Sequence, residues 1–176
     1  MYAVVLIALS TGARLGEVLG IRWPDVDLER GAITLHNTKN GDRRSLPLVG
    51  SVLELVGDRS KVRRIDDDRV FPHAKRKDRR LDISAAWYGA LATARQAYAE
   101  ACACAGREPE LGFLTDFRFH DLRHTCASYL LGSGVSIGEI ARILGHRTLQ
   151  MTLRYSHLDD RAIRDAVGRM NAAIFR

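Results

Sequence analysis

The sequence predicts an α+β fold that is mainly helical and contains a small antiparallel sheet. Two observations support this prediction. Apolar residues recur at helical spacing through most of the chain, whereas the clearest alternation typical of strands flanks the Asn-Gly pair at 40–41. The chain has 176 residues, 46% of them hydrophobic, which is enough for one domain with a well-buried core.

Two helices are expected before the sheet. Residues 1–10 are predominantly apolar and predict a buried helix, which a Thr-Gly pair ends. The stretch ARLGEVLGI, residues 13–21, predicts a second helix. Its inward-facing side chains are expected to be Leu15, Val18 and Leu19.

A β-hairpin is expected next. AITLHNTK (32–39) and RRSLPL (43–48) predict its two strands, and the Asn-Gly pair between them is a strong turn signal. Lys39 is therefore expected beside the tip of the hairpin.

The following stretch, residues 61–80, is strongly basic. KVRRIDDDRVFPHAKRKDRR contains nine Lys and Arg against four Asp, and thus holds five of the six net positive charges of the chain. We expect a loop with a short strand near Val70 and Phe71. The loop is either a solvated charged surface or a contact for a phosphate backbone. In the second case the candidate DNA-binding residues are Lys75, Arg76, Lys77, Arg79 and Arg80.

Two longer helices are predicted in the second half of the chain. One covers residues 82–106, and its aromatic side chains are expected in the core. The other begins near residue 119 and closes at Gly132 or Gly134. The apolar stripe of the first is expected to comprise Ile83, Trp87, Ala90, Ala94, Tyr98 and Ala101.

Shorter helices are predicted towards the C-terminus. One begins with Ser136 and Glu139 in capping-box spacing and ends at a glycine. Thr148 is placed to cap the next, which is expected to carry Tyr155. The last is amphipathic, spans about 161–174, and has Ile163, Val167, Met170 and Ile174 on one stripe.

Charge and cysteine content indicate which partners and which cellular setting fit the sequence. The net charge of +6 and the pI of about 9.6 suit either a polyanionic partner or a basic protein without one. The three cysteines show no disulfide framework, which favours a reduced, cytoplasmic setting. The apolar start is too short to span a bilayer and lacks the basic residue of a secretion signal. A core helix that begins directly at Met1 suggests that a natural N-terminal part is missing.

One helix face concentrates proton-transfer groups. His120, Arg123 and His124 stand at i, i+3 and i+4 in FHDLRHTCASYLL. A zinc site, a polar cluster that satisfies helix ends and an anion-binding catalytic site are all compatible with this face. Zinc is disfavoured, because Arg123 repels a cation and the Glu of a His-Glu-x-x-His motif is absent.

Of these three kinds of site, the anion-binding catalytic site accounts for the largest number of candidate residues. Phosphoryl transfer needs cations on the nonbridging oxygens, a nucleophile, a base and an acid. Arginine suits the first task because its planar fork binds two oxygens. The candidates, each beside a glycine, a turn or a helix end, are Arg14, Lys39, His120, Arg123, His146 and Tyr155.

Three stretches together resemble the catalytic domain of the tyrosine recombinases, the phage integrase family. They are TGARLGEVLGIRWPDVDLERGAITLHNTKNGDRRSLPL, FHDLRHTCASYLLGSGVSIGEIARILGH and MTLRYSHLD, in the order of that family, over about residues 9–160. Each short motif is weak alone, but jointly with the hairpin lysine the pattern is highly specific.

The resemblance implies a role for each candidate. Arg14 and Arg123 would clamp the scissile phosphate, and His146 would donate a hydrogen bond to it. Lys39 would be the general acid for the 5′-oxygen. The other implied roles are a base or proton shuttle for His120, the nucleophile for Tyr155, orientation of neighbouring groups for Glu17, and a packed or indirect role for His124.

The implied activity is breakage and rejoining of double-stranded DNA through a 3′-phosphotyrosyl intermediate, without metal or cofactor. Residues 1–176 would then be the catalytic domain alone, without the family's N-terminal core-binding domain. The implied assembly is a monomer that forms a homotetramer on two synapsed DNA sites, with no membrane contact. Two alternatives stay open: a type IB topoisomerase-like strand transferase, and a DNA-binding fragment of a decayed integrase that has lost catalysis.

Overall fold

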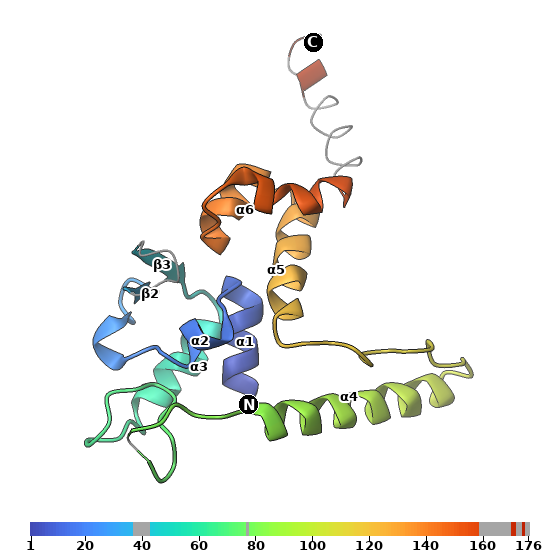
Figure 1. The fold of residues 1–176 in the computed structure, drawn as a ribbon. Coiled ribbons are helices and arrows are strands. Elements are labelled where there is room, and N and C mark those ends of the chain that lie inside the picture. Colours follow the sequence, from blue (N-terminus) through green and yellow to red (C-terminus); the bar gives the residue numbers. More distant parts are fainter. Residues whose placement is uncertain (37–42, 77, 159–169, 172–173, 175–176) are drawn as a thin grey trace.

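The computed structural model describes residues 1–36, 43–76, 78–158, 170–171 and 174 (Figure 1). Within these residues, helices make up most of the regular structure and the strands form a small antiparallel sheet, so the predicted fold class is confirmed. The α-helices are α1 (Tyr2–Thr11), α2 (Leu15–Val18), α3 (Ser51–Ser60), α4 (Ser84–Cys104), α5 (Asp121–Gly132) and α6 (Ile137–Leu144).

The sheet follows from the alternation around the predicted hairpin. Its strands, in spatial order, are β1 (Val26–Asp27), β2 (Ala32–Leu35) and β3 (Arg44–Pro47). Ile33 lies opposite Leu46, and Leu35 lies opposite Arg44, and all four side chains are buried. Because side chains alternate between the faces of a strand, the same pattern that buries the leucines also buries the arginine. The predicted turn and Lys39 lie outside the described residues.

The core consists of two hydrophobic clusters joined by α5. The larger cluster contains α1, α2, the sheet, α3 and the start of α4, with α1 in contact with both α3 and α5. The smaller cluster joins the second half of α5 to α6 and the ring of Tyr155. In Figure 1, α5 rises from beside α1 towards α6. The first turns of α5 therefore lie where the two clusters meet.

Helix α3 is an element to which the sequence analysis assigned no structure. Its buried side chains are Val52 and Val56, one turn apart, while most of the remaining positions are polar. Two inward-facing residues make too short a periodic pattern to stand out from a loop. The helix is instead stabilised by packing against α1, which its local sequence pattern does not indicate.

Helix α4 begins and ends two residues inside the predicted range, and it lacks most of the predicted buried stripe. Ile83 and Trp87 are buried, whereas Ala90, Ala94 and Ala101 are exposed, and Tyr88 is 68% exposed. In Figure 1, α4 extends away from the other helices, and the segment between α4 and α5 runs back alongside it. Tyr98 is half-buried and stacks on Phe113 of that segment, with ring centroids 3.9 Å apart. Spacing alone cannot bury a side chain where nothing lies opposite it. In the part of the chain that the structure describes, no helix combines the length and apolar character needed to cross a bilayer.

The predicted caps of α6 are confirmed, whereas Thr148, the N-cap residue of the next turn, makes no side-chain cap hydrogen bond. Ser136 and Glu139 form the expected capping box, and Gly145 ends α6 in the left-handed conformation. Two 3₁₀ turns, Leu149–Met151 and Leu153–Leu158, replace the single helix expected after Thr148, and Tyr155 lies in the second. Thr152, which is fully buried, separates the two turns. Of the predicted last stripe, Met170 and Ile174 are helical, and Ile163 and Val167 fall outside the described residues.

Candidate active site

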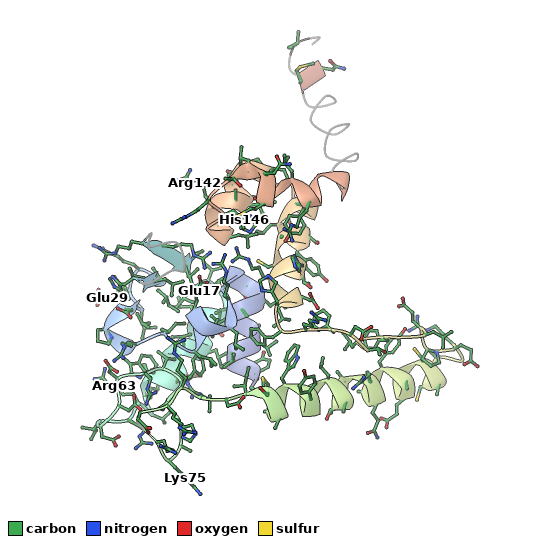
Figure 2. All side chains as sticks on the ribbon, in the orientation of Figure 1. Glu17, Glu29, Arg63, Lys75, Arg142 and His146 are labelled. Carbon is green, nitrogen blue, oxygen red and sulfur yellow. The ribbon has the colours of Figure 1, made fainter. Side chains whose placement is uncertain are left out.

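Five of the six predicted catalytic residues lie within the described part of the chain, and their side chains line one pocket at the junction of the two clusters. The pocket has a volume of about 300 Å³, and none of its described lining side chains is a carboxylate. Glu17 and His146 mark the α2 and α6 sides of this region in Figure 2. Lys39 lies outside the described residues. The lining residues are Arg14, His120, Arg123, His124, His146, Arg147, Met151, Arg154 and Tyr155.

A larger cavity of about 890 Å³ is less suited to an anion. It lies on the side of the basic loop and is lined by Asp66, Asp67 and Asp68 as well as by arginines. Several of those charges already form ion pairs, such as that of Arg69 with Asp67 at 2.6 Å. An anion entering this cavity would meet carboxylates, whereas the smaller pocket presents cations and imidazoles.

Arg123 is the most buried cation of the pocket, with 3% of its surface exposed. Its Nη1 donates to the carbonyl oxygen of Gly12 and its Nη2 to that of Leu144, each at 2.7 Å. These carbonyls lie at the C-terminal ends of α1 and α6, where the peptide dipoles leave partial negative charge. Burial lowers the pKa of Arg123 to about 10, so the guanidinium stays charged at neutral pH.

Glycine is required at both helix ends that hold Arg123. Gly12 and Gly145 have φ of +64° and +68°, in the left-handed region. A Cβ on Gly12 would also overlap the side chain of Leu144. The close approach of α1 and α6 at this point allows one guanidinium to contact both.

Arg14 is held by Glu17, as expected of an orienting carboxylate. Arg14 is the N-cap of α2, and its Nη1 donates to Glu17 Oε1 at 2.9 Å. The other carboxylate oxygen, Oε2, accepts the backbone N–H of Arg14 at 2.9 Å. The short helix α2 and the side chain of Arg14 are therefore fixed by the same carboxylate.

Arg44 is a member of this network that the sequence analysis missed. It is 8% exposed, and its Nη2 donates to Glu17 Oε2 at 2.7 Å. Its Nη1 donates to the carbonyls of Ile143 and Leu144, at the end of α6. The sequence does contain one signal for Arg44, because the alternation of the strand places it on the side of β3 that faces the core, opposite Leu35. Arg44 thereby connects β3 to both sides of the pocket.

His146 follows Gly145 and faces the arginines. Its Nδ1 lies 2.7 Å from Thr152 Oγ1. If Thr152 donates to Nδ1, the remaining proton is on Nε2 and is available to an anion. Burial, followed by the charges of Arg123 and Arg14, lowers the pKa of His146 to about 4. The imidazole is thus neutral at physiological pH while the pocket is empty.

The hydroxyl of Tyr155 contacts His124. Tyr155 Oη lies 2.6 Å from His124 Nδ1, and the ring of Tyr155 is 6% exposed. His120, the N-cap of α5, stands edge to face against His124 with ring centroids 5.2 Å apart. This contact places His124 directly beside the predicted nucleophile. Burial raises the pKa of Tyr155, while the charge of Arg154 acts in the opposite direction.

The part of the basic loop around Lys75 lies away from the pocket. Figure 2 shows Lys75 at the opposite end of the molecule from His146. Arg76 forms an ion pair with Asp78 at 2.9 Å, and Arg79 and Arg80 line the larger cavity. Lys77 lies outside the described residues. None of the described candidates in this loop is brought together with the catalytic set.

A metal site is not apparent in this region either. Across the described ranges, no three His, Cys, Asp or Glu side chains group as metal ligands would. His120 and His124 instead share their pocket with arginines, and His124 contacts Tyr155.

The lowered pKa of His146 predicts loss of stability in acid. Between about pH 6.5 and pH 4 the unfolded chain binds a proton at this histidine that the folded chain does not, so the free energy of unfolding falls as the pH drops through this window. We expect a loss on the order of 1–3 kcal/mol from this site. Urea unfolding at pH 7 and pH 5 measures it. A His146→Asn variant should lose less stability over the interval; an equal loss would contradict the prediction.

Comparison with known proteins places this arrangement in a family. Residues 1–162 match the model of the phage integrase family. The type 1 fimbriae regulatory protein FimE of Escherichia coli strain K12 is 32% identical over 155 residues, which cover 88% of this chain and 73% of FimE. The shufflon-specific DNA recombinase of Escherichia coli is 33% identical over 161 residues, which cover 90% of this chain but only 35% of that protein.

A solved structure supports the same assignment. The catalytic domain of bacteriophage HP1 integrase superimposes with a TM-score of 0.61 at 26% identity, over 98% of this chain and 83% of that domain. The fold, the order of the motifs and the match to residues 1–162 agree. The chain belongs to the phage integrase family.

Proposed function

We propose that this chain is the catalytic domain of a tyrosine recombinase, which cuts and rejoins double-stranded DNA through a 3′-phosphotyrosyl intermediate. One observation carries the proposal. A buried tyrosine hydroxyl and the guanidinium groups of Arg14 and Arg123 line the same pocket, whose described lining contains no carboxylate. Such a pocket is complementary to a phosphodiester and supplies a nucleophile to attack it.

The chemistry divides among the residues of the pocket. Arg14 and Arg123 bind the nonbridging oxygens, where charge gathers in the transition state, and His146 donates a further hydrogen bond. Tyr155 attacks phosphorus, and Lys39 protonates the departing 5′-oxygen. A 5′-hydroxyl from another strand reverses the step, so the energy of the bond is conserved in the intermediate. His120, beside the phosphate site, serves as a proton shuttle.

DNA is the proposed partner for two reasons. The shufflon-specific relative is named a DNA recombinase. The excess positive charge of this chain, +6 in total, suits a polyanion. Lys75, Arg76, Lys77, Arg79 and Arg80 would contact the DNA backbone away from the scissile phosphate. We further propose a monomer in the absence of DNA and a tetramer on two synapsed sites, acting in the cytoplasm.

The proposal is tested by trapping the covalent intermediate. The chain is incubated with a pool of nicked duplexes of randomised sequence, from which the cleaved fragment diffuses away and leaves the protein attached. We expect a protein–DNA product that survives denaturation, is released by protease, and forms equally well with EDTA. Binding without such a product would favour a non-catalytic fragment. Relaxation of supercoiled plasmid without site preference would favour a topoisomerase.

A further inference from the structure

The nearest proton acceptor to the nucleophile is a residue that the family resemblance left with an indirect role. In the described part of the chain, Tyr155 Oη lies 2.6 Å from His124 Nδ1, and this nitrogen accepts the hydrogen bond of the hydroxyl when the imidazole carries its proton on Nε2. His120 contacts the ring of His124 instead. A general base must lie within hydrogen-bond reach of the proton that it removes, and His124 meets this requirement in the unbound protein.

We propose that His124 Nδ1 is the proton acceptor for Tyr155 during DNA cleavage, an inference that rests on the proposed function. The O–H bond of Tyr155 breaks and its proton goes to Nδ1, while Oη forms a bond to phosphorus. The bond between phosphorus and the 5′-oxygen breaks, and that oxygen takes a proton from a separate donor, Lys39 in the proposal above. On rejoining, His124 returns its proton to the phenolic oxygen.

Packing holds both partners independently of their mutual bond. The ring of Tyr155 is buried in the smaller cluster, against α5 and α6. His124 lies in α5 next to Arg123, which is fixed by the carbonyls of Gly12 and Leu144. Substitution of His124 therefore should leave the tyrosine in place, so that a change in rate reports on chemistry.

The pocket that contains His124 is lined by cations. A phosphodiester bound there would bring negative charge next to His124, and a negative charge favours a nearby imidazolium. Bound DNA would therefore assist the transfer of the proton from Tyr155 to His124. The cations that line the pocket are Arg14, Arg123, Arg147 and Arg154.

Two substitutions separate proton transfer from positioning. In His124→Asn, the amide oxygen lies near the position of Nδ1 and can accept the hydrogen bond, but it cannot take the proton. In His124→Ala, both functions are lost. We expect both variants to bind DNA like the wild type and to cleave nicked duplexes about 10²–10⁴-fold more slowly. Tyr129→Phe, on the exposed side of the same helix, is the control for general effects on α5.

A second measurement distinguishes a base from a structural support. Incorporation of a fluorinated tyrosine at position 155 lowers the pKa of the phenol, and this should restore much of the rate of His124→Asn while changing the wild type little. The cleavage rate of the variant should also keep rising with pH where that of the wild type levels off. Cleavage by His124→Asn at the wild-type rate, or no response to the fluorinated tyrosine, would overturn the inference while leaving the proposed function intact. Absence of a covalent product from the wild type would instead overturn the proposed function, and this inference with it.

Discussion

A Tyr155→Phe variant is expected to form no covalent complex with DNA, while its affinity for DNA stays close to that of the wild type. The substitution removes one oxygen atom and no charge. The ring keeps its place in the smaller cluster, so the fold loses only the hydrogen bond to His124, worth about 1 kcal/mol. The cations that bind the phosphate are unchanged. Denaturing gels of trapped complexes measure the first effect, and fluorescence anisotropy measures the second.

Tyr88→Phe provides the matched control for this substitution. Tyr88 is 68% exposed on α4, away from the pocket, and should form the covalent complex normally. A phosphotyrosyl product from Tyr155→Phe would show that the nucleophile is another residue. Loss of DNA binding in Tyr155→Phe would show that the hydroxyl binds the substrate rather than attacking it.

Arg123→Ala is expected to reduce both the cleavage rate and the stability of the fold. The rate should fall by roughly 10²–10³, as for other preorganised electrostatic donors. The free energy of unfolding should fall as well, because the buried carbonyl of Gly12 loses its donor, a loss of about 1–3 kcal/mol. The carbonyl of Leu144 keeps a contact from Arg44. Thermal melting and single-turnover cleavage well below the melting temperature measure the two effects separately.

Two lysine variants test whether cleavage needs the planar guanidinium group of arginine. A lysine at position 123 can reach one of the two helix ends but cannot hold both and face a phosphate, so rate and stability should stay low. Arg14→Lys should lose rate with little loss of stability, because Arg14 is half-buried and pairs only locally with Glu17. Full cleavage activity in Arg123→Lys would rule out the clamp that we propose.

The elements that could be predicted from the sequence are those specified by neighbouring residues. The Asn-Gly turn with alternating flanks predicts the hairpin, and Ser136 with Glu139 predicts the start of α6. The short helix α3 and the exposed face of α4 could not be predicted, because both depend on what lies opposite them. Periodicity shows which side chains share a face but not whether another element covers that face.

The same distinction applies to the pocket. Its catalytic candidates were identified from residue type and local position, and the resemblance then assigned their roles through motifs that are each local. The contact of His124 with Tyr155 joins positions 31 residues apart, and that of Arg44 with Glu17 joins positions 27 residues apart. In neither pair does the sequence around one residue indicate the identity of the other. An arginine on the inward side of a predicted strand does indicate a buried partner, although it does not identify the partner.

The two arginines that meet at the end of α6 also have a consequence for the order of folding. Arg123 and Gly12 are 111 residues apart in the chain, and Arg44 and Leu144 are 100 residues apart. Contacts of such large sequence separation are slow to form, because a long loop must close before they stabilise anything. On the ribosome, the segments of α1 and β3 emerge long before α6. We therefore expect the pocket to assemble late, so that a nascent chain has no competence to cut DNA until Tyr155 has been synthesised and the two ends of the domain have met.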